Sequence, residues 1–145
     1  MRPRRFSEVE AYQHADDQYF YRPLVAGKEL FTYIAHVPAG GVMPPDAEEA
    51  EQFELSLFML QGELQVTLAE DRFALRQADA LHIPRTVPFG VANTTDHTAS
   101  FVLSFSPPPM VDLHTMRERA EASGRTVLDA QECQRRFGPF AILED

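Results

Sequence analysis

A series of short apolar segments between Leu30 and Ser106 constrains the fold of this chain more than any other feature. The segments are rich in β-branched and aromatic residues, which favour strands, and each is followed by residues that favour turns. The strongest breaks are Pro38-Ala39-Gly40-Gly41, Gln61-Gly62 and Asn93-Thr94-Thr95-Asp96. The predicted strands span residues 30–37, 53–60, 63–69, 72–75, 80–83, 88–92 and 98–106.

Within these segments, apolar and polar residues alternate as they do in a sheet with one wet face. The clearest example is residues 63–68, where Leu64, Val66 and Leu68 alternate with Glu63, Gln65 and Thr67. Side chains of a strand point to opposite faces in turn, so this period of two indicates one buried and one solvated face. Seven short strands at this spacing predict an all-β sandwich or barrel.

The two ends of the chain differ from this β region. Residues 1–29 are polar and mixed, and we expect an arm that packs on the body, with room for one short strand. Three prolines at 107–109 precede a predicted helix over residues 110–123, which Gly124 would end. A second helix is predicted from Thr126, capped by its hydroxyl with Asp129 reaching back, to about residue 136. We expect one domain, with an arm (1–29), a body (30–106) and a helical tail packed on it (107–145).

The net charge of the chain is −9, from 22 acidic and 13 basic residues, and Lys28 is the only lysine. An acidic surface without a basic stripe repels phosphate groups, so we expect neither nucleic acid nor an anionic membrane as a partner. Part of the excess is concentrated in one short stretch, which contains Asp46, Glu48, Glu49, Glu51 and Glu54.

The sequence contains no pattern typical of export or of membrane insertion. No apolar run reaches the 18 residues or so that a membrane-spanning helix needs, and no apolar stretch follows the basic N-terminal residues. The one cysteine, Cys133, cannot form a disulfide within the chain and is expected to be an inert structural thiol. We therefore expect a cytoplasmic protein.

Two stretches resemble the two motifs of the cupin family, which are small β-barrels of the jelly-roll type. Residues 38–64 (PAGGVMPPDAEEAEQFELSLFMLQGEL) are similar to the first motif, where a Pro-Gly turn leads to metal ligands and to a strand that ends in Gly-Glu-Leu. Residues 79–94 (DALHIPRTVPFGVANT) are similar to the second motif, where an Ile-Pro strand leads to a Pro-His pair and an Asn. The resemblance implies a cupin jelly-roll β-barrel over residues 30–106, and a homodimer, because many cupins pair sheet on sheet.

In the family, two histidines and a carboxylate of the first motif and a histidine of the second hold a divalent metal inside the barrel. The resemblance places Glu49, Glu51, Leu55 and Phe89 at these positions, and a slip of one residue in the loop would replace the first two by Glu48 and Ala50. Leu55 and Phe89 have no lone pair to donate, and two carboxylates alone hold a metal weakly. We therefore expect neither the usual metal nor another cofactor.

Among cupins, residues 31–64 and 92–95 look most like the ureidoglycine aminohydrolase family. Those enzymes are double cupins in which the first barrel has lost its ligands and the second carries the metal and the chemistry. This chain resembles the first barrel alone. The likeness implies a metal-free barrel and does not imply that hydrolase activity.

Glu49, Glu51 and His82 are the candidate catalytic residues. Glu49 and Glu51 point the same way along an extended segment, and two carboxylates held close together can form a proton donor and acceptor pair. His82 lies on the predicted strand 80–83 and would be an acid–base group if its side faced the cavity. The alternatives are a solvated acidic loop for the glutamates and an outward imidazole, in solvent or at a dimer face, for His82.

A ligand pocket would be formed by the apolar side chains that the motifs place in the barrel. The candidate ligand-binding residues are Leu55, Leu57, Met59, Phe89 and His36. A cavity with such walls and a few polar groups at its mouth is a typical small-molecule site. The alternative is a core that these side chains fill completely.

Three functions follow from these alternatives. The first is a metal-independent cupin that binds a small organic molecule and catalyses proton transfer of the isomerase or lyase type. The second is a non-catalytic sensing or accessory binding module. The third is a metal-dependent oxygenase or hydrolase with rearranged ligands, drawn from His36, His82 and a glutamate.

Overall fold

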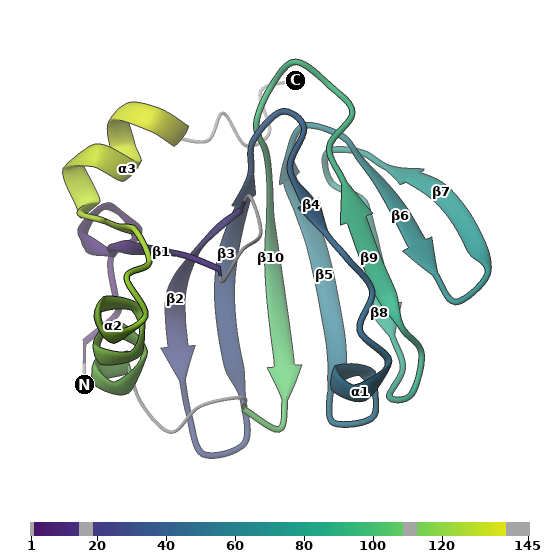
Figure 1. Cartoon of the computed structure of the whole chain (residues 1–145), viewed down its shortest axis with the longest axis horizontal. Helices are drawn as coiled ribbons and strands as arrows, with labels where there is room; N and C mark the ends of the chain where they lie inside the picture. Colours follow the sequence, from purple (N-terminus) through teal and green to yellow (C-terminus); the bar gives the residue numbers. More distant parts are fainter. Residues whose placement is uncertain (1, 15–18, 109–112, 139–145) are drawn as a thin grey trace.

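The computed structural model describes residues 2–14, 19–108 and 113–138, and strands dominate it (Figure 1). Eleven strands in this part of the chain form two antiparallel sheets. The larger sheet has the order β11 (Val127–Leu128), β1 (Ala11–Gln13), β2 (Phe20–Ala26), β3 (Phe31–Val37), β10 (Ala99–Ser106), β5 (Glu54–Gln61) and β8 (Ala80–Ile83). The smaller has the order β4 (Val42–Met43), β9 (Phe89–Ala92), β6 (Leu64–Leu68) and β7 (Asp71–Leu75).

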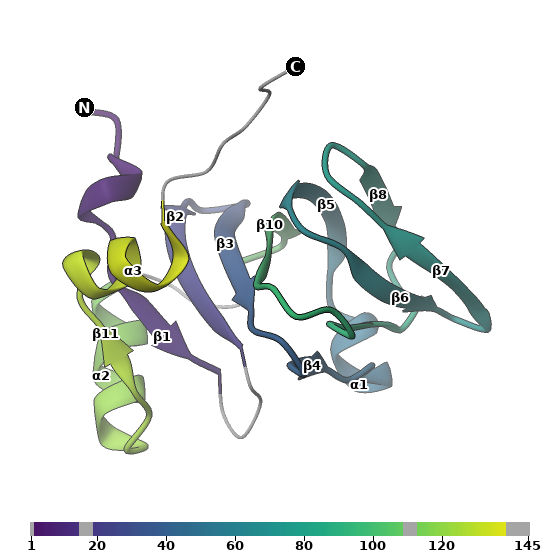
Figure 2. The ribbon, with the colours of Figure 1, turned by 90° about the horizontal axis from the view of Figure 1, so that it is seen from above.

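All seven predicted strands are present, each within one residue of its predicted bounds. The sheets also recruit β1, β2, β4 and β11, which the sequence did not single out. The fold is that of a jelly roll, with two sheets that face each other (Figure 2). Because β2 pairs with β3 and β11 pairs with β1, segments from before and after residues 30–106 join the larger sheet beyond β3. The predicted division of the chain at these residues stays a prediction.

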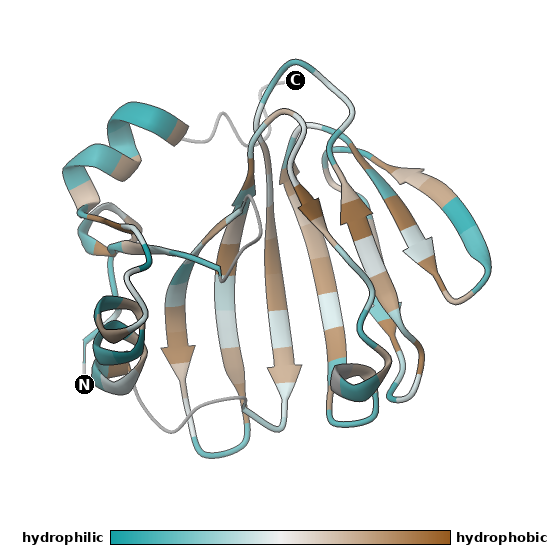
Figure 3. Cartoon of the chain, in the orientation of Figure 1, coloured by the Kyte–Doolittle hydropathy of each residue, from teal (hydrophilic) through white to brown (hydrophobic). Residues whose placement is uncertain are grey.

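The core lies between the two sheets and follows the predicted alternation. On β5 the inward side chains Leu55, Leu57 and Met59 are buried, and they pair in register with Phe105, Leu103 and Phe101 of β10. The outward residues of β5, Glu54, Ser56 and Phe58, are exposed. Figure 3 shows the result as apolar bands that alternate with polar ones along the strands.

Two helices cover opposite faces of the end of the larger sheet. The helix α2 (Leu113–Ala122) adds Met116 and Ala120 to the main core, on the side of Tyr12 and Tyr21. The helix α3 (Ala130–Phe137) and the 3-10 helix η1 (Phe6–Glu8) lie over the outer face, where α3 contributes Cys133. The first part of the predicted helix 110–123 lies outside the described residues, and the rest agrees with α2.

The predicted start of the second helix is wrong. Residues 127–128 form β11, because Ala11 and Tyr12 of β1 offer an edge with which they pair. Asp129, and not Thr126, then caps α3, since its carboxylate accepts a hydrogen bond from the backbone N–H of Glu132 at 2.8 Å. Strand pairing therefore delays the helix by about one turn relative to the capping pattern in the sequence.

Gly62 joins β5 to β6 in a conformation that other residues rarely adopt. Its φ is +81°, and a Cβ atom placed on it would lie 2.9 Å from the Cα atom of Ala99. Gly40 has nearly the same φ, +79°, with no atom within 4 Å of such a Cβ. The two glycines thus share the backbone constraint and differ in the space around them.

We expect Gly62→Ala to lower the free energy of unfolding by about 2–4 kcal/mol and Gly40→Ala by about 1 kcal/mol. Both variants place an alanine at a positive φ, which is strained. Only Gly62→Ala also pushes the turn between β5 and β6 away from the backbone of β10. Urea unfolding of the two variants measures the difference. Equal losses in both would contradict the close approach at Gly62.

Candidate functional site

A pocket of about 460 Å³ lies between the two sheets, at the end of the molecule where α1 (Ala47–Ala50) is found (Figure 1). Its walls come from both sheets and from the segment that connects β4 to β5. The described side chains that line it are His14, Tyr19, Tyr33, Met43, Pro44, Pro45, Asp46, Ala47, Glu48, Ala50, Phe53, Leu55, Val87, Phe89, Leu103 and Phe105. The size is that of a pocket for a small organic molecule.

Aromatic rings form much of the wall. Phe105 of β10 meets Tyr33 of β3 and Phe53 edge to face, with ring centroids 5.2 and 5.6 Å apart. On the opposite side of the pocket, Phe89 enters from β9 of the smaller sheet. Such contacts between rings restrict their motion, so this wall is preorganised.

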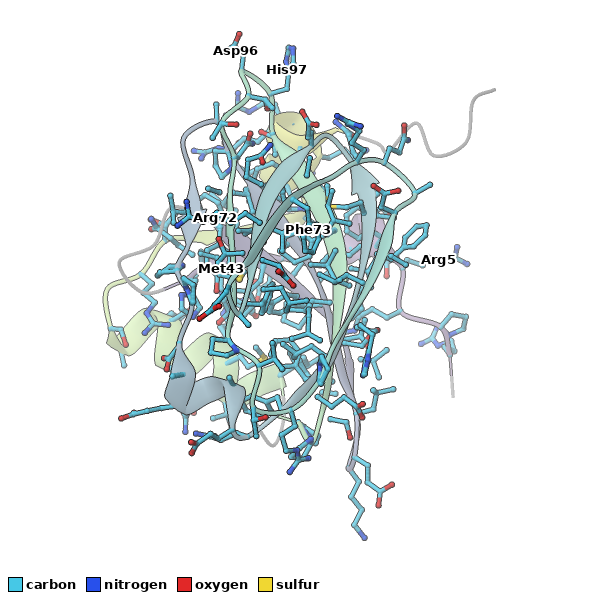
Figure 4. All side chains as sticks on the ribbon, turned by 90° about the vertical axis from the view of Figure 1, so that its right-hand side faces the viewer. Arg5, Met43, Arg72, Phe73, Asp96 and His97 are labelled. Atoms are coloured by element: carbon cyan, nitrogen blue, oxygen red, sulfur yellow. The ribbon has the colours of Figure 1, made fainter. Side chains whose placement is uncertain are left out.

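The segment between β4 and β5 forms the mouth. Asp46 begins α1, and its carboxylate accepts a hydrogen bond from the backbone N–H of Glu48 at 2.9 Å. The chain before it passes directly over β9, because a Cβ atom on Gly90 would lie only 2.6 Å from Cδ of Pro45. Figure 4 shows the neighbouring Met43 in the interior, with Asp96 and His97 at the far end of the molecule. Because residue 90 is a glycine, Pro45 can pack directly on β9, and this contact positions the mouth of the pocket.

Two residues from the N-terminal segment complete the pocket. His14 follows β1, and Tyr19 precedes β2. Their rings stack with centroids 4.7 Å apart and an interplanar angle of 15°, and Tyr19 is buried. The N-terminal segment thus contributes an imidazole and a phenol to the site.

The apolar residues predicted for the cavity divide into two groups. Leu55 and Phe89 line the pocket, at its mouth end. Leu57 and Met59 point the same way as Leu55 but lie farther along β5, where they are completely packed in the core. Each step of two residues along a strand moves a side chain by about 6.6 Å, which is enough to leave the pocket.

The predicted glutamates lie around the mouth. Glu48 and Ala50 line the pocket, in agreement with the alignment slipped by one residue, whereas Glu51 is exposed and is not among the lining residues. The backbone of Glu49 belongs to α1, but its side chain lies outside what the structure describes. The short helix turns successive side chains by about 100°, so the extended geometry assumed for Glu49 and Glu51 is wrong.

Of the two orientations that the sequence left open for His82, the structure shows the outward one. Its strand, β8, is at the edge of the larger sheet, and Ile83 takes the inward position. His82 pairs in register with the outward Ser56, and its imidazole, 61% exposed, lies 2.8 Å from the carboxylate of Glu54. The outward alternative for His82 is the one that the structure supports.

His36 belongs to a different environment and does not line the pocket. It points to the outer face of β3, where it is completely buried, and its Nδ1 lies 2.8 Å from the hydroxyl of Ser100. The ring of Phe137 from α3 stacks on it with centroids 4.0 Å apart. Burial, with a smaller contribution from the nearby guanidinium of Arg22, lowers the pKa of His36 to about 3. The imidazole is therefore neutral at ordinary pH.

The donor atoms present do not fit the metal site of the family. Of the positions that resemblance assigns to ligands, Leu55 and Phe89 project apolar side chains into the pocket. Among the side chains that the structure describes, which do not include that of Glu49, no three His, Cys, Asp or Glu residues gather closely enough to hold a metal ion. A rearranged site with His36 and His82 is not possible either, since β10 and β5 separate their strands by roughly 14 Å.

The residues that sequence reasoning missed come mainly from outside the two motifs. His14, Tyr19 and Tyr33 reach the pocket because β1 and β2 extend the larger sheet past β3. The aromatic cluster at residues 19–21 was a visible signal, but nothing in a single sequence pairs it with β3. Phe53 and Phe105 could have been found from the alternation, as inward residues at the mouth end of β5 and β10.

The Cupin domain family model matches residues 33–105. The polyketide cyclase RemF from Streptomyces resistomycificus is similar in structure, with 18% identity, a TM-score of 0.66, and 78% of this chain and 85% of that chain covered. KdgF from a Halomonas species has 18% identity and a TM-score of 0.60, with 67% and 86% covered. A predicted oxalate decarboxylase from Thermotoga maritima has 13% identity and a TM-score of 0.65, with 72% and 97% covered. The comparison with curated proteins finds no match.

Proposed function

The chain belongs to the cupin family, and we propose that it binds a small organic molecule in the pocket between its sheets without a metal ion. The observation that carries the proposal is the pair Leu55 and Phe89. The resemblance to cupins assigns both to positions where the family keeps metal ligands, and their side chains line a pocket whose polar groups lie elsewhere. A pocket with apolar walls and a few polar groups is suited to such a ligand.

The finer part of the proposal is proton transfer, of the isomerase or lyase type. The side chains suited to it are His14 and Glu48, because both border the pocket. Imidazole and carboxylate groups are the side chains that most often act as general acids and bases. We therefore assign proton transfer to His14 and Glu48, in place of the predicted pairing of Glu49 or Glu51 with His82.

A non-catalytic binding module is the second candidate. Its support is the exposed position of Glu51 and His82, which removes two of the three predicted catalytic groups from the pocket and leaves a mainly apolar wall. Homodimerisation and a cytoplasmic location stay predictions from the sequence. No helix in the described part of the chain is long and apolar enough to cross a membrane.

Benzyl alcohol is a suitable first probe, because it has one ring and one hydroxyl. We expect it to bind with a dissociation constant on the order of 1 mM, as befits a ligand of eight heavy atoms, and to bind equally well after treatment with EDTA. Amide chemical shifts in two-dimensional NMR would report binding at the pocket. Protein purified without chelator should contain no stoichiometric transition metal.

Leu55→Trp and Phe89→Trp should each abolish this binding, because an indole fills the pocket from one sheet or the other. Phe58→Trp is the matched control, since Phe58 lies on the outer face of the same strand as Leu55 and is 41% exposed. A dispersed NMR spectrum shows whether each variant is folded. Stoichiometric metal, or binding that survives in folded variants of both pocket residues, would overturn the proposal.

A further inference from the structure

We infer that the pocket selects aromatic molecules that are neutral or positively charged, and that it rejects organic anions. The inference rests on the proposed function, since it concerns the ligand of the same site. It follows from two features of the pocket, which are the charges in its lining and the orientation of its rings, and the start of α1 offers no anion site that would oppose them.

The charges that border the pocket are negative. Asp46 and Glu48 are in its described lining, which includes no lysine or arginine. Arg85, in the turn between β8 and β9, is exposed and is not a lining residue. The imidazole of His14 is the one basic group in the described lining, so an anionic ligand would meet two carboxylates without a fixed cation to offset them. Charges of like sign at a half-open site raise the free energy of binding.

The rings favour the same kind of ligand. Phe105 contacts Tyr33 and Phe53 edge to face, and Tyr19 stacks on His14. All five rings line the pocket, and they lie at several angles to one another. The face of an aromatic ring is electron-rich, and it attracts both the edge of another ring and a cation. The wall therefore favours a planar aromatic ligand and tolerates a positive group on it.

The start of α1 offers no compensation to an anion. Helix N-termini bind anions through backbone N–H groups that have no partner within the helix. Here the N–H of Glu48 already donates to the carboxylate of Asp46, at 2.9 Å. The same contact places the negative charge of Asp46 where an anion would have to bind.

Benzylammonium, benzyl alcohol and benzoate test the inference, because they share one ring and differ mainly in charge. At neutral pH and an ionic strength of about 0.02 M, we expect benzylammonium to bind at least about tenfold more tightly than benzoate, with benzyl alcohol between them. Raising the ionic strength to about 0.5 M should reduce the ratio to roughly threefold or less. Two-dimensional NMR titrations give the three dissociation constants and identify the residues in contact.

The double variant Asp46→Asn/Glu48→Gln should bring benzylammonium and benzoate to within about twofold of each other at low salt. Asparagine keeps an oxygen that can accept the hydrogen bond from residue 48, so α1 can persist. Glu54→Gln/Glu63→Gln is the matched control, because it removes the same charge away from the lining and should keep most of the ratio. Equal binding of all three probes, or preference for benzoate, would overturn the charge inference and leave pocket binding intact. Failure of all three to shift the pocket residues would overturn the proposed function itself.

Discussion

Acidification from pH 6.5 to pH 4.5 is expected to lower the free energy of unfolding by about 2 kcal/mol through His36 alone. Burial of the ring among Ser100, Phe137 and the outer face of β3 lowers its pKa from 6.5 to about 3. Well above pH 6.5 the imidazole is neutral in both states and contributes nothing to the pH dependence. Below pH 6.5 the unfolded chain takes up a proton that the folded chain does not, so each pH unit costs about 1.4 kcal/mol.

Between pH 6.5 and pH 4.5 the expected loss of stability is due to His36. Glu132, whose pKa is lowered to about 2 by hydrogen bonds from Arg135 and Arg136, adds to acid sensitivity only below its unfolded pKa of 4.5. Continued to pH 3, the loss due to His36 reaches about 4 kcal/mol. Urea unfolding at closely spaced pH values measures the slope.

The control for this prediction is a ring that cannot be protonated. His36→Phe should keep the stacking on Phe137 and lose the slope between pH 6.5 and pH 4.5, even if the loss of the contact with Ser100 lowers stability at every pH. His97→Gln, in the exposed turn before β10, should keep the slope of the wild type. A slope that persists unchanged in His36→Phe would contradict the assignment.

Arg22→Met is expected to lower the free energy of unfolding by about 3 kcal/mol. Arg22 is completely buried on β2, and its guanidinium donates hydrogen bonds to the backbone carbonyls of Phe6 and Val9, at 2.7 to 3.1 Å. It also lies over the ring of Phe6, 3.7 Å from the centroid. Methionine fills part of the space but donates nothing, so the carbonyls of Phe6 and Val9 lose the hydrogen bonds from the guanidinium.

The same variant should release η1 from the sheet. We expect faster amide hydrogen exchange in residues 5–10 than in β5, because only the former depend on the guanidinium. Arg76→Met is the control, since Arg76 is exposed and bound to Glu63 at the surface, and it should cost less than about 0.5 kcal/mol. A loss in Arg22→Met as small as that of the control would show that the buried hydrogen bonds do not hold η1.

The strands and their inner faces could be predicted because the period of two is a property of each segment by itself. Leu55 and Phe89 were identified as pocket residues from the motifs, and the structure places both in the pocket lining. The start of α3 was predicted about one turn too early, because the pairing of β11 with β1 keeps residues 127–128 extended and leaves Asp129 to cap the helix.

The pocket itself could be predicted only in part. His14, Tyr19 and Tyr33 lie in it because β2 pairs with β3, and a pairing between distant segments leaves no mark in the pattern of either segment. Which residues border the mouth depended on the register of the loop. The sequence left two registers open, one with Glu49 and Glu51 and the other with Glu48 and Ala50. In the structure Glu48 and Ala50 line the pocket and Glu51 does not, while the side chain of Glu49 lies outside what the structure describes.

The sequence by itself determined that this chain forms an all-β sandwich or barrel with an apolar interior, because strand period and turn residues are local properties. It could not tell what would lie on the outer face of each strand. His36 and His82 both point outward, yet His36 is buried beneath Phe137 and His82 is exposed beside Glu54. The difference arises because α3 and η1 pack over β2 and β3 and leave β5 and β8 open, and only the tertiary structure decides where a helix packs.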